Sequence, residues 1–479
     1  PPPTLDSSRT DGWSEEFKWS FSLVPLWQGH FDQSDNVVWD ISPAAMGNVP
    51  DLPQNYEEHR DFYDLHEGGD TGKGHAVNPH TGKPYESQLV QRADYTRVLA
   101  EFWADGPDTE TPPGHWYTIL NHVTGHTEFE KKFRGDGRTL DDLEWDVKSY
   151  FTLGGAVHDA AIAAWGIKGR YDYTRPVSAI RWMADRGQSS DPGKAGFNPE
   201  GIPLYEGSIE LVREGDPLAG AENEHVGKIK LNTWRGHEYI EDPETETAGV
   251  GWILAENWWP YQRPTFVTPP FAGFVSGHST FSRSAAEVMT LLTGDPFFPG
   301  GLGEFHAPAN EFLVFEDGPE ETVILQWATY RDASDQCSLS RIWGGIHPPI
   351  DDIHGRLIGE KVGINAFEQA EKYFAGTVPK PDESPVSWKL EQNYPNPFNL
   401  HTTISFYIRE QSKILLKVYD ITGREVATVV SQTVAGGNHT RHWNASGLAS
   451  GVYIYRLEAQ PVSGQAKRYV ETRKATLIK

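Results

Sequence analysis

The chain has almost no cysteine. Cys337 is the one cysteine among 479 residues, so an internal disulfide is excluded, and the Cys/His spacing of a zinc finger is absent. We expect Cys337 to be a small packed residue. The sequence has no run of 18 apolar residues, which argues against a transmembrane helix. It begins with Pro1 and not with Met, and we interpret it as a processed mature form whose targeting peptide has been removed.

Positive charge is also scarce. The chain has 42 Lys and Arg against 67 Asp and Glu, a net charge of −25. Such a surface repels nucleic acid and anionic membranes, so we expect neither as a partner. A site for an anion must therefore be built locally, against the field of the whole protein. Hydrophobic residues make up 38% and Trp occurs 17 times, which is enough for a sizeable core. The length predicts two or more domains.

Two regions of the chain differ in their periodicity. Residues 1–378 contain helical patterns, and the sequence predicts a mainly α catalytic domain built as a helical bundle. Residues 379–392 are rich in proline and read as a linker. Residues 393–479 alternate as short strands separated by turns, which predicts a small antiparallel β-sandwich. The clearest expected helices span 95–106, 139–169, 279–294 and 351–376.

The stretch FVSGHSTF, residues 274–281, opens the third of these helices. The first turn of a helix has unpaired N–H groups and partial positive charge. Ser276 or Ser279 can cap the helix, Gly277 allows close approach of a ligand, and His278 adds a titratable group. Together they form a cradle for an anion. Taken alone, the triplet is explained more simply as a serine cap beside a structural histidine.

Two further stretches add cations and another histidine. KGRYDYTRP contains Lys168 and Arg175, and RIWGGIHPPID contains Arg341, His347 and Asp351. Arg presents a rigid fork to an oxyanion, and Lys a mobile point charge. Each cation taken singly would be an ordinary surface charge. Three of them with two histidines are what a tetrahedral oxyanion site needs.

The order Lys-x6-Arg-Pro, Ser-Gly-His and Arg-x5-His-x3-Asp resembles the signature of the type 2 phosphatidic acid phosphatase superfamily. That superfamily includes the vanadium-dependent haloperoxidases and several acid phosphatases. All three blocks are intact and in order, and the resemblance extends over residues 60–375. It implies vanadate (V5+) as cofactor, with no haem and no nucleotide.

The resemblance implies a role for each motif residue. His347 would bond vanadium, or attack phosphorus in a phosphatase. Asp351 would hold the other ring nitrogen of His347 and fix its tautomer. His278 would be the acid/base, and Lys168 would also polarise peroxide. The groups that would bind the oxygens of vanadate or phosphate are Lys168, Arg175, Ser276, Gly277 and Arg341.

The activity that this resemblance favours is oxidation of halide by hydrogen peroxide to hypohalous acid, which then reacts with a small organic acceptor. Trp165 and Phe271 stand where related chloroperoxidases carry Trp and Phe, so they would line a dry halide pocket; core packing is the simpler explanation of both. An acid phosphatase that cleaves monoesters through a phosphohistidine uses the same residues and stays open. A non-catalytic surface protein that binds oxyanions is a third reading.

The tail has a resemblance of its own. LEQNYPNPFN, KVYDITGREVATVV and ASGLASGVYIYRLEA, within residues 389–479, resemble the C-terminal sorting domain of the bacterial type IX secretion system. The sequence departs from that family at Leu400-His401. The resemblance implies the type IX export machinery as partner and a location outside the cell, secreted or on the bacterial surface. The alternative interpretation of the tail is a module that docks to another protein or binds carbohydrate.

The composition of the chain is compatible with a homodimer but locates no interface.

Overall fold

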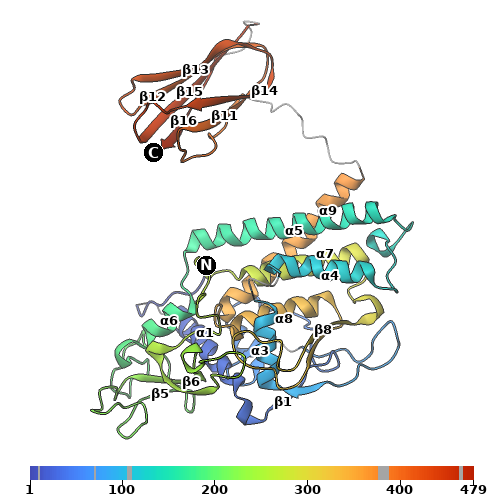
Figure 1. The fold of residues 1–479 in the computed structure, drawn as a ribbon, viewed down its shortest axis with the longest axis vertical. Coiled ribbons are helices and arrows are strands. Elements are labelled where there is room, and N and C mark those ends of the chain that lie inside the picture. The colour runs from blue at the N-terminus through green and yellow to red at the C-terminus, as the bar shows by residue number, and fades with distance from the viewer. Residues whose placement is uncertain (9–10, 70–71, 105–109, 376–387, 463–467) are drawn as a thin grey trace. The chain divides into compact units, whose positions relative to one another are not determined.

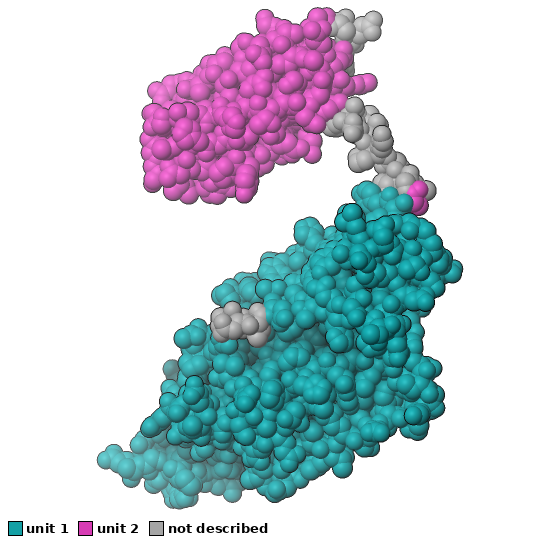
Figure 2. Space-filling view, turned by 45° about the vertical axis from the view of Figure 1, so that its right-hand side comes forward, with its two compact units in different colours: residues 1–374 teal, residues 375–479 magenta. Residues whose placement is uncertain are grey.

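The computed structural model describes residues 1–8, 11–69, 72–104, 110–375, 388–462 and 468–479. The chain divides into two compact units, residues 1–374 and 375–479 (Figure 2). Most of the expected linker, from 379 to 387, lies outside the described residues. The predicted order of a helical bundle followed by antiparallel strands is confirmed (Figure 1).

The first unit is organised around a bundle of helices. The central helix α7 packs against α4, α5, α8 and α9. Ser276 is the N-cap of α7, as one of the two expected candidates, and its Oγ accepts from Ser279 N; Gly294 ends the helix in the left-handed conformation. The bundle helices are α4 (Pro112–Gly125), α5 (Asp142–Tyr171), α7 (Gly277–Thr293), α8 (Tyr330–Trp343) and α9 (Pro349–Phe374).

A row of glycines brings α9 very close to α7. Gly355, Gly359 and Gly363 are spaced by four residues, so they lie on one face of α9. A methyl group added at Gly359 would lie 2.5 Å from the carbonyl oxygen of Thr280, and one at Gly355 would lie 2.9 Å from that of Ser276. The two helices can touch backbone to backbone only because these side chains are absent. The contact places the start of α7 beside the start of α9.

Shorter elements surround the bundle. The helices α1 and α3 lie beside α8, and α6 follows α5 directly in the chain. The short helices are α1 (Trp13–Trp27), α2 (His59–Phe62), α3 (Arg92–Phe102) and α6 (Pro176–Met183). The antiparallel strands form four small sheets. Three are pairs: β1 (Val38–Asp40) with β4 (Leu89–Gln91), β2 (Tyr63–Asp64) with β3 (Gly68–Gly69), and β8 (Gly303–Ala307) with β9 (Val323–Trp327). The fourth sheet has three strands, β5 (Ile209–Leu211), β6 (Ile229–Trp234) and β7 (Val250–Leu254).

The second unit consists of two antiparallel sheets on a shared apolar core, with strand orders β10-β11-β14 and β13-β12-β15-β16. Burial alternates along β12, where Ile414, Leu416 and Val418 face the core. The first strand begins at Lys389, four residues before the expected start of the sandwich. The strands are β10 (Lys389–Leu390), β11 (His401–Ile408), β12 (Ser412–Asp420), β13 (Glu425–Val434), β14 (Gly437–Asn444), β15 (Gly451–Pro461) and β16 (Tyr469–Leu477).

One strand was not expected from the sequence. β13, Glu425–Val434, has intermediate or exposed side chains at eight of its ten positions, so its burial does not alternate as it does along β12. It lies at the edge of the four-stranded sheet and pairs with β12 through two register shifts. An edge strand with little burial has a weak hydrophobic pattern, which is why the periodicity did not reveal it.

The glycine row yields a prediction about stability. Gly359→Ala should lower the free energy of unfolding of the helical unit by about 1–3 kcal/mol, because the methyl group meets the backbone of α7. The control is Gly125→Ala at the end of α4, where a methyl group meets nothing within 4 Å. Urea unfolding followed by near-UV circular dichroism of the tryptophans measures both. Equal midpoints for the two variants would contradict the close-packing argument.

Candidate active site

Segments that are far apart in the sequence meet in one buried cluster of polar side chains, called the hollow below because an oxyanion would have to fit between them. Lys168 Nζ, in the last turn of α5, donates to the carbonyl oxygens of Ala272 at 2.9 Å and Gly273 at 2.7 Å. Arg175, the N-cap of α6, donates through Nη1 to the carbonyl oxygen of Ile346 at 2.8 Å. The motif residues buried there are Lys168, Arg175, Ser276, Gly277, His278, Arg341, His347 and Asp351. The structure thus brings the three sequence blocks together.

His347 is held in one tautomer. Its Nδ1 lies 2.6 Å from Asp351 Oδ2, and its Nε2 lies 3.1 Å from Arg175 Nη1. The guanidinium can only donate, so Nε2 must carry the lone pair and Nδ1 the proton that is donated to Asp351. Burial and the charges of Arg175 and Lys168 hold the pKa of His347 well below its ordinary value. The ring is therefore neutral, with the lone pair that a metal ligand or a nucleophile needs.

Among the described residues, Lys168 and Arg175 form no direct ion pair, although the charge of Asp351 acts on both and raises the pKa of each against the effect of burial. Both side chains donate to backbone carbonyls instead. Burial lowers the pKa of Lys168 to about 7 and that of Arg175 to about 10, with further lowering of each by a neighbouring arginine. Burial raises the pKa of Asp351 to about 7. Two buried cations that share one nearby carboxylate are costly, and a bound anion would lower that cost.

His278 completes the arrangement. It is buried, and its Nε2 makes no hydrogen bond to any residue that the structure describes. Burial and the charge of Arg341 hold the pKa of His278 well below its ordinary value. A hydrogen bond to the backbone of Trp103 raises this pKa, but by less than the other effects lower it. Arg341 Nη1 donates to the carbonyl oxygen of that same Trp103 at 3.2 Å. A neutral imidazole with a buried, unused nitrogen can accept a proton from a group bound in the hollow.

Trp165 and Phe271 lie at the rim. Their ring centroids are 5.1 Å apart, and Lys168 Nζ lies 5.7 Å and 5.3 Å from the two centroids. A methyl group added at Gly277 would lie 3.2 Å from the Trp165 ring. The rings are 41% and 40% exposed, so core packing does not explain them. The dry halide pocket expected at these two residues stays a prediction.

Asp352 is a second carboxylate of this region, and the sequence motifs did not identify it. Asp352 Oδ1 accepts from Ser279 Oγ at 2.8 Å, and Ser279 Oγ lies 2.9 Å from Ser276 Oγ. Arg356 holds Asp352 through Nε at 2.9 Å and Nη2 at 2.7 Å. This buried network holds the first turn of α7 in place. The i, i+4 spacing of Asp352 and Arg356 in a helical segment was the available signal.

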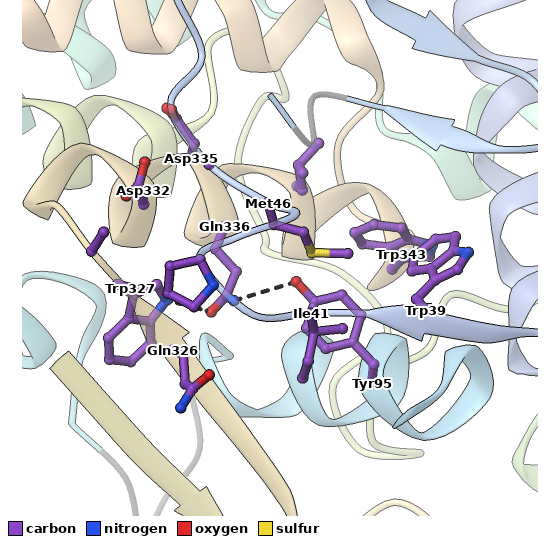
Figure 3. A pocket seen from close by; sticks show the side chains of 14 residues that line it. Trp39, Ile41, Met46, Tyr95, Gln326, Trp327, Asp332, Asp335, Gln336 and Trp343 are labelled. Carbon is purple, nitrogen blue, oxygen red and sulfur yellow. Dashed lines mark hydrogen bonds between the residues drawn. The ribbon is translucent and has the colours of Figure 1, made fainter. Parts of the chain in front are cut away.

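A separate small cavity lies between the segment 39–47, α3 and α8 (Figure 3). Trp39, Tyr95 and Trp343 line it, with Asp335 at one edge. Its volume is about 40 Å³, which holds no more than a few water molecules. Gln336 Nε2 donates to Tyr95 Oη across it at 3.3 Å. None of the motif residues lines this cavity, so it is distinct from the oxyanion hollow.

Residues 148–376 match the family model of the VCPO second helical-bundle domain, and residues 392–471 match that of the secretion system C-terminal sorting domain. The first unit carries a VCPO-type helical-bundle domain. The predicted resemblance of both parts is therefore confirmed. The type IX sorting domain indicates secretion or attachment to the cell surface. No helix among the described residues is both long and apolar enough to cross a membrane.

Solved structures similar to this chain include an apo-type bacterial vanadium-dependent chloroperoxidase, with 18% identity and a TM-score of 0.40, over 60% of this chain and 46% of that one. A bacterial vanadium-dependent iodoperoxidase has 20% identity and a TM-score of 0.32, over 57% and 43%. Dimeric latent PorU from Porphyromonas gingivalis has 17% identity and a TM-score of 0.16, over 20% and 10%. The chain thus spans less than half the length of each. No curated protein matches it.

Lys168 yields a prediction about protons. At pH 8 a lysine with a pKa near 7 is mostly neutral, and a bound oxyanion would raise that pKa and charge it. Binding of inorganic phosphate at pH 8 should then take up about one proton more in the wild type than in Lys168→Met. At pH 5.5 the lysine is already charged, so the difference should vanish. Calorimetry in two buffers of different ionisation enthalpy measures the number of protons taken up. Equal proton uptake by the wild type and Lys168→Met at pH 8 would contradict a role for Lys168 in oxyanion binding.

Proposed function

We propose that the helical unit is a vanadate-dependent haloperoxidase that oxidises halide with hydrogen peroxide to hypohalous acid. The observation that carries this proposal is the pair of buried cations, Lys168 and Arg175, which donate to backbone carbonyls beside the neutral His347. A tetrahedral oxyanion supplies the missing negative charge, and the Nε2 lone pair of His347 supplies a ligand to its centre. The acceptor of the oxidised halide would be a small organic molecule.

The residues present fit vanadate. His347 Nε2 would be the ligand to vanadium, and the oxygens would be bound by Lys168, Arg175, Ser276, the Gly277 N–H and Arg341. When bound, vanadate supplies a Lewis acid that activates peroxide without changing its own oxidation state. Asp351 keeps His347 in the required tautomer through the 2.6 Å contact.

The remaining side chains handle the proton and the substrates. His278 Nε2, buried and without a partner among the described groups, takes a proton from hydrogen peroxide as the peroxide enters, and returns it to the product oxygen. A bound oxyanion would raise the pKa of Lys168 so that its amine takes up a proton, and the resulting ammonium would polarise peroxide for attack by halide. Trp165 and Phe271 are 41% and 40% exposed and would border the approach. The Trp165 ring crowds Gly277, which should favour small substrates.

An acid phosphatase is the second candidate. A neutral His347 with an oriented lone pair is also the nucleophile that a phosphohistidine intermediate needs. The crowding of Gly277 by the Trp165 ring disfavours a bulky monoester in that position. A non-catalytic oxyanion-binding protein would have no use for the unpartnered His278 Nε2.

For the tail, we propose that the type IX export machinery recognises this sorting domain.

Two assays on the same preparation test the choice. Full-length protein is incubated with orthovanadate and assayed for bromination of monochlorodimedone with peroxide. The untreated protein is assayed for hydrolysis of para-nitrophenyl phosphate. We expect bromination that depends on vanadate and hydrolysis that is slow by comparison. Strong hydrolysis with no bromination would reverse the assignment.

His347→Ala should abolish vanadate binding and lower bromination by at least about 10³-fold, because the ligand to the metal is lost. His306→Ala, on strand β8 with an exposed side chain, is the matched control and should retain both. Equilibrium dialysis with vanadium analysis measures binding. Normal vanadate affinity of the His347 variant would contradict the ligand assignment.

His278→Ala should separate binding from turnover. The imidazole makes no hydrogen bond through Nε2, so vanadate affinity should change by less than about tenfold while kcat falls by about 10²–10⁴-fold. The same dialysis and bromination assays measure both quantities. A variant that loses affinity and retains kcat would show that His278 binds the oxyanion and does not transfer protons.

A further inference from the structure

A second cavity lies at the far end of helix α6 from the oxyanion hollow. Arg175 is the N-cap residue of α6, and Arg181 stands in its last turn, about 9 Å further along the helix axis. Arg181 lines a cavity of about 540 Å³, a volume within the range of sites for small organic molecules. None of the motif residues of the hollow lines this cavity. It is called the α6 cavity below, and it is separate from the hollow.

The walls of the α6 cavity come from α6 and from the chain around strands β6 and β7, which lie in the same part of the helical unit (Figure 1). Arg235 follows β6 directly, and His237–Tyr239 form a short 3-10 turn beyond it. Ile253 and Leu254 end β7 and are buried. Trp259 follows a few residues later. The cavity thus has an apolar floor and polar walls.

Trp259 joins the cationic and aromatic parts of the lining. Cζ of Arg181 lies 5.3 Å from the centroid of the Trp259 ring system, and the centroid of the His237 ring lies 4.8 Å from it. Cζ of Arg235 lies 4.7 Å from the centroid of the Tyr239 ring. Guanidinium groups stacked on rings keep their N–H edges available to a carboxylate. A ligand that carries both a ring and a negative charge matches this combination.

The two guanidinium groups are oriented by the backbone and keep unused donors. Arg181 donates through Nε at 3.0 Å and Nη2 at 2.7 Å to the carbonyl oxygen of Trp258, and Arg235 Nε donates to that of Ala248 at 2.6 Å. Arg181 Nη1 and both Nη atoms of Arg235 donate to no residue that the structure describes. Neither side chain forms an ion pair within 4.0 Å in the same ranges. Such oriented N–H groups are suited to a carboxylate.

Two further nitrogens of the lining have no partner. Trp259 Nε1 and His237 Nδ1 are buried and make no hydrogen bond within the described part of the chain. Buried polar atoms without a partner are rare in folded proteins and often mark a place where water or an ion binds. They lie in the same cluster as Arg181, so they point to this end of the cavity.

Two carboxylates border the cavity. Glu256 is paired with Lys228 at 2.8 Å. Glu238 is exposed; burial lowers the pKa of Arg181 and of His237, and the charge of Glu238 raises both in part. An anion in the cavity is therefore attracted by the two arginines and repelled by Glu238.

We propose that the α6 cavity binds a small organic anion, a carboxylate attached to a ring system. The Nη groups of Arg181 and Arg235 bind the carboxylate, and the ring lies against Trp259 and the floor of Ile253 and Leu254. An inorganic anion would leave the apolar floor and the rings unused. A neutral ring compound would leave the guanidinium donors unused. This inference does not depend on which reaction the hollow catalyses.

Equilibrium dialysis of the full-length chain against 2-naphthoate, at neutral pH and low salt, tests the ligand class. 2-Naphthylmethanol has the same ring and no charge, and acetate has the charge and no ring. We expect one 2-naphthoate per chain, bound at least about tenfold more tightly than either comparison compound. Equal binding of 2-naphthylmethanol, or equal binding of acetate, overturns the proposal.

Substitutions test the location. Arg181→Gln and Arg235→Gln should each weaken 2-naphthoate binding by about tenfold or more, because a charged hydrogen bond is lost. Arg186→Gln is the matched control, since its side chain is 92% exposed just beyond α6; it should bind like the wild type. Lys168→Met changes the hollow alone and should also bind normally. Binding that survives both cavity substitutions, or that is lost in Lys168→Met, overturns the location.

Glu238→Gln gives a test that loss of structure cannot imitate. It removes the opposing charge from an exposed position, so 2-naphthoate should bind about twofold to fivefold more tightly. Circular dichroism melting confirms that this variant and the arginine variants are folded. An affinity of Glu238→Gln no higher than that of the wild type overturns the assignment of an anion to this cavity.

Discussion

The candidate site beside α5, α7 and α9 is defined by the buried cations Lys168 and Arg175, whose charge Asp351 offsets only in part. Lys168 and Arg175 are held by backbone carbonyls and have no carboxylate within ion-pair distance in the part of the chain that the structure describes. Desolvation makes such cations costly. An entering oxyanion would lower this cost further, which is why we propose that the site binds one. The net charge of −25 makes this local reversal of sign more pronounced.

Close helix packing holds the chemical groups in register. The glycine row of α9 lets its backbone approach α7, and Ser276 N donates to the carbonyl oxygen of Asp351 at 2.9 Å. The contact that joins the two helices is thus also the contact that sets Ser276 and His278 against His347. A shift of one helix would move both halves of the site apart.

Two neighbouring aspartates at the start of α9 serve different partners. Asp351 meets His347, while Asp352 meets Ser279 and Arg356. Consecutive residues on an α-helix point about 100° apart, so one turn reaches two separate networks. The first network fixes the protonation state of the imidazole. The second fixes the serine cap of α7.

Local signals in the sequence determined a large part of this protein. The cap Ser276, the stop Gly294, the order of the three motifs and the alternating strands of the tail depend on near neighbours in the chain, and each could be predicted from the residues alone. Tertiary packing decided the rest. Periodicity identifies α5 as a helix, but it cannot tell that Val147 and Phe151 stay exposed while Ala156 and Ala164 are buried, because burial depends on which elements pack against each face. The bond from Ser279 to Asp352 and the exposure of the Trp165 ring were decided in the same way, by contacts between residues that are distant in sequence.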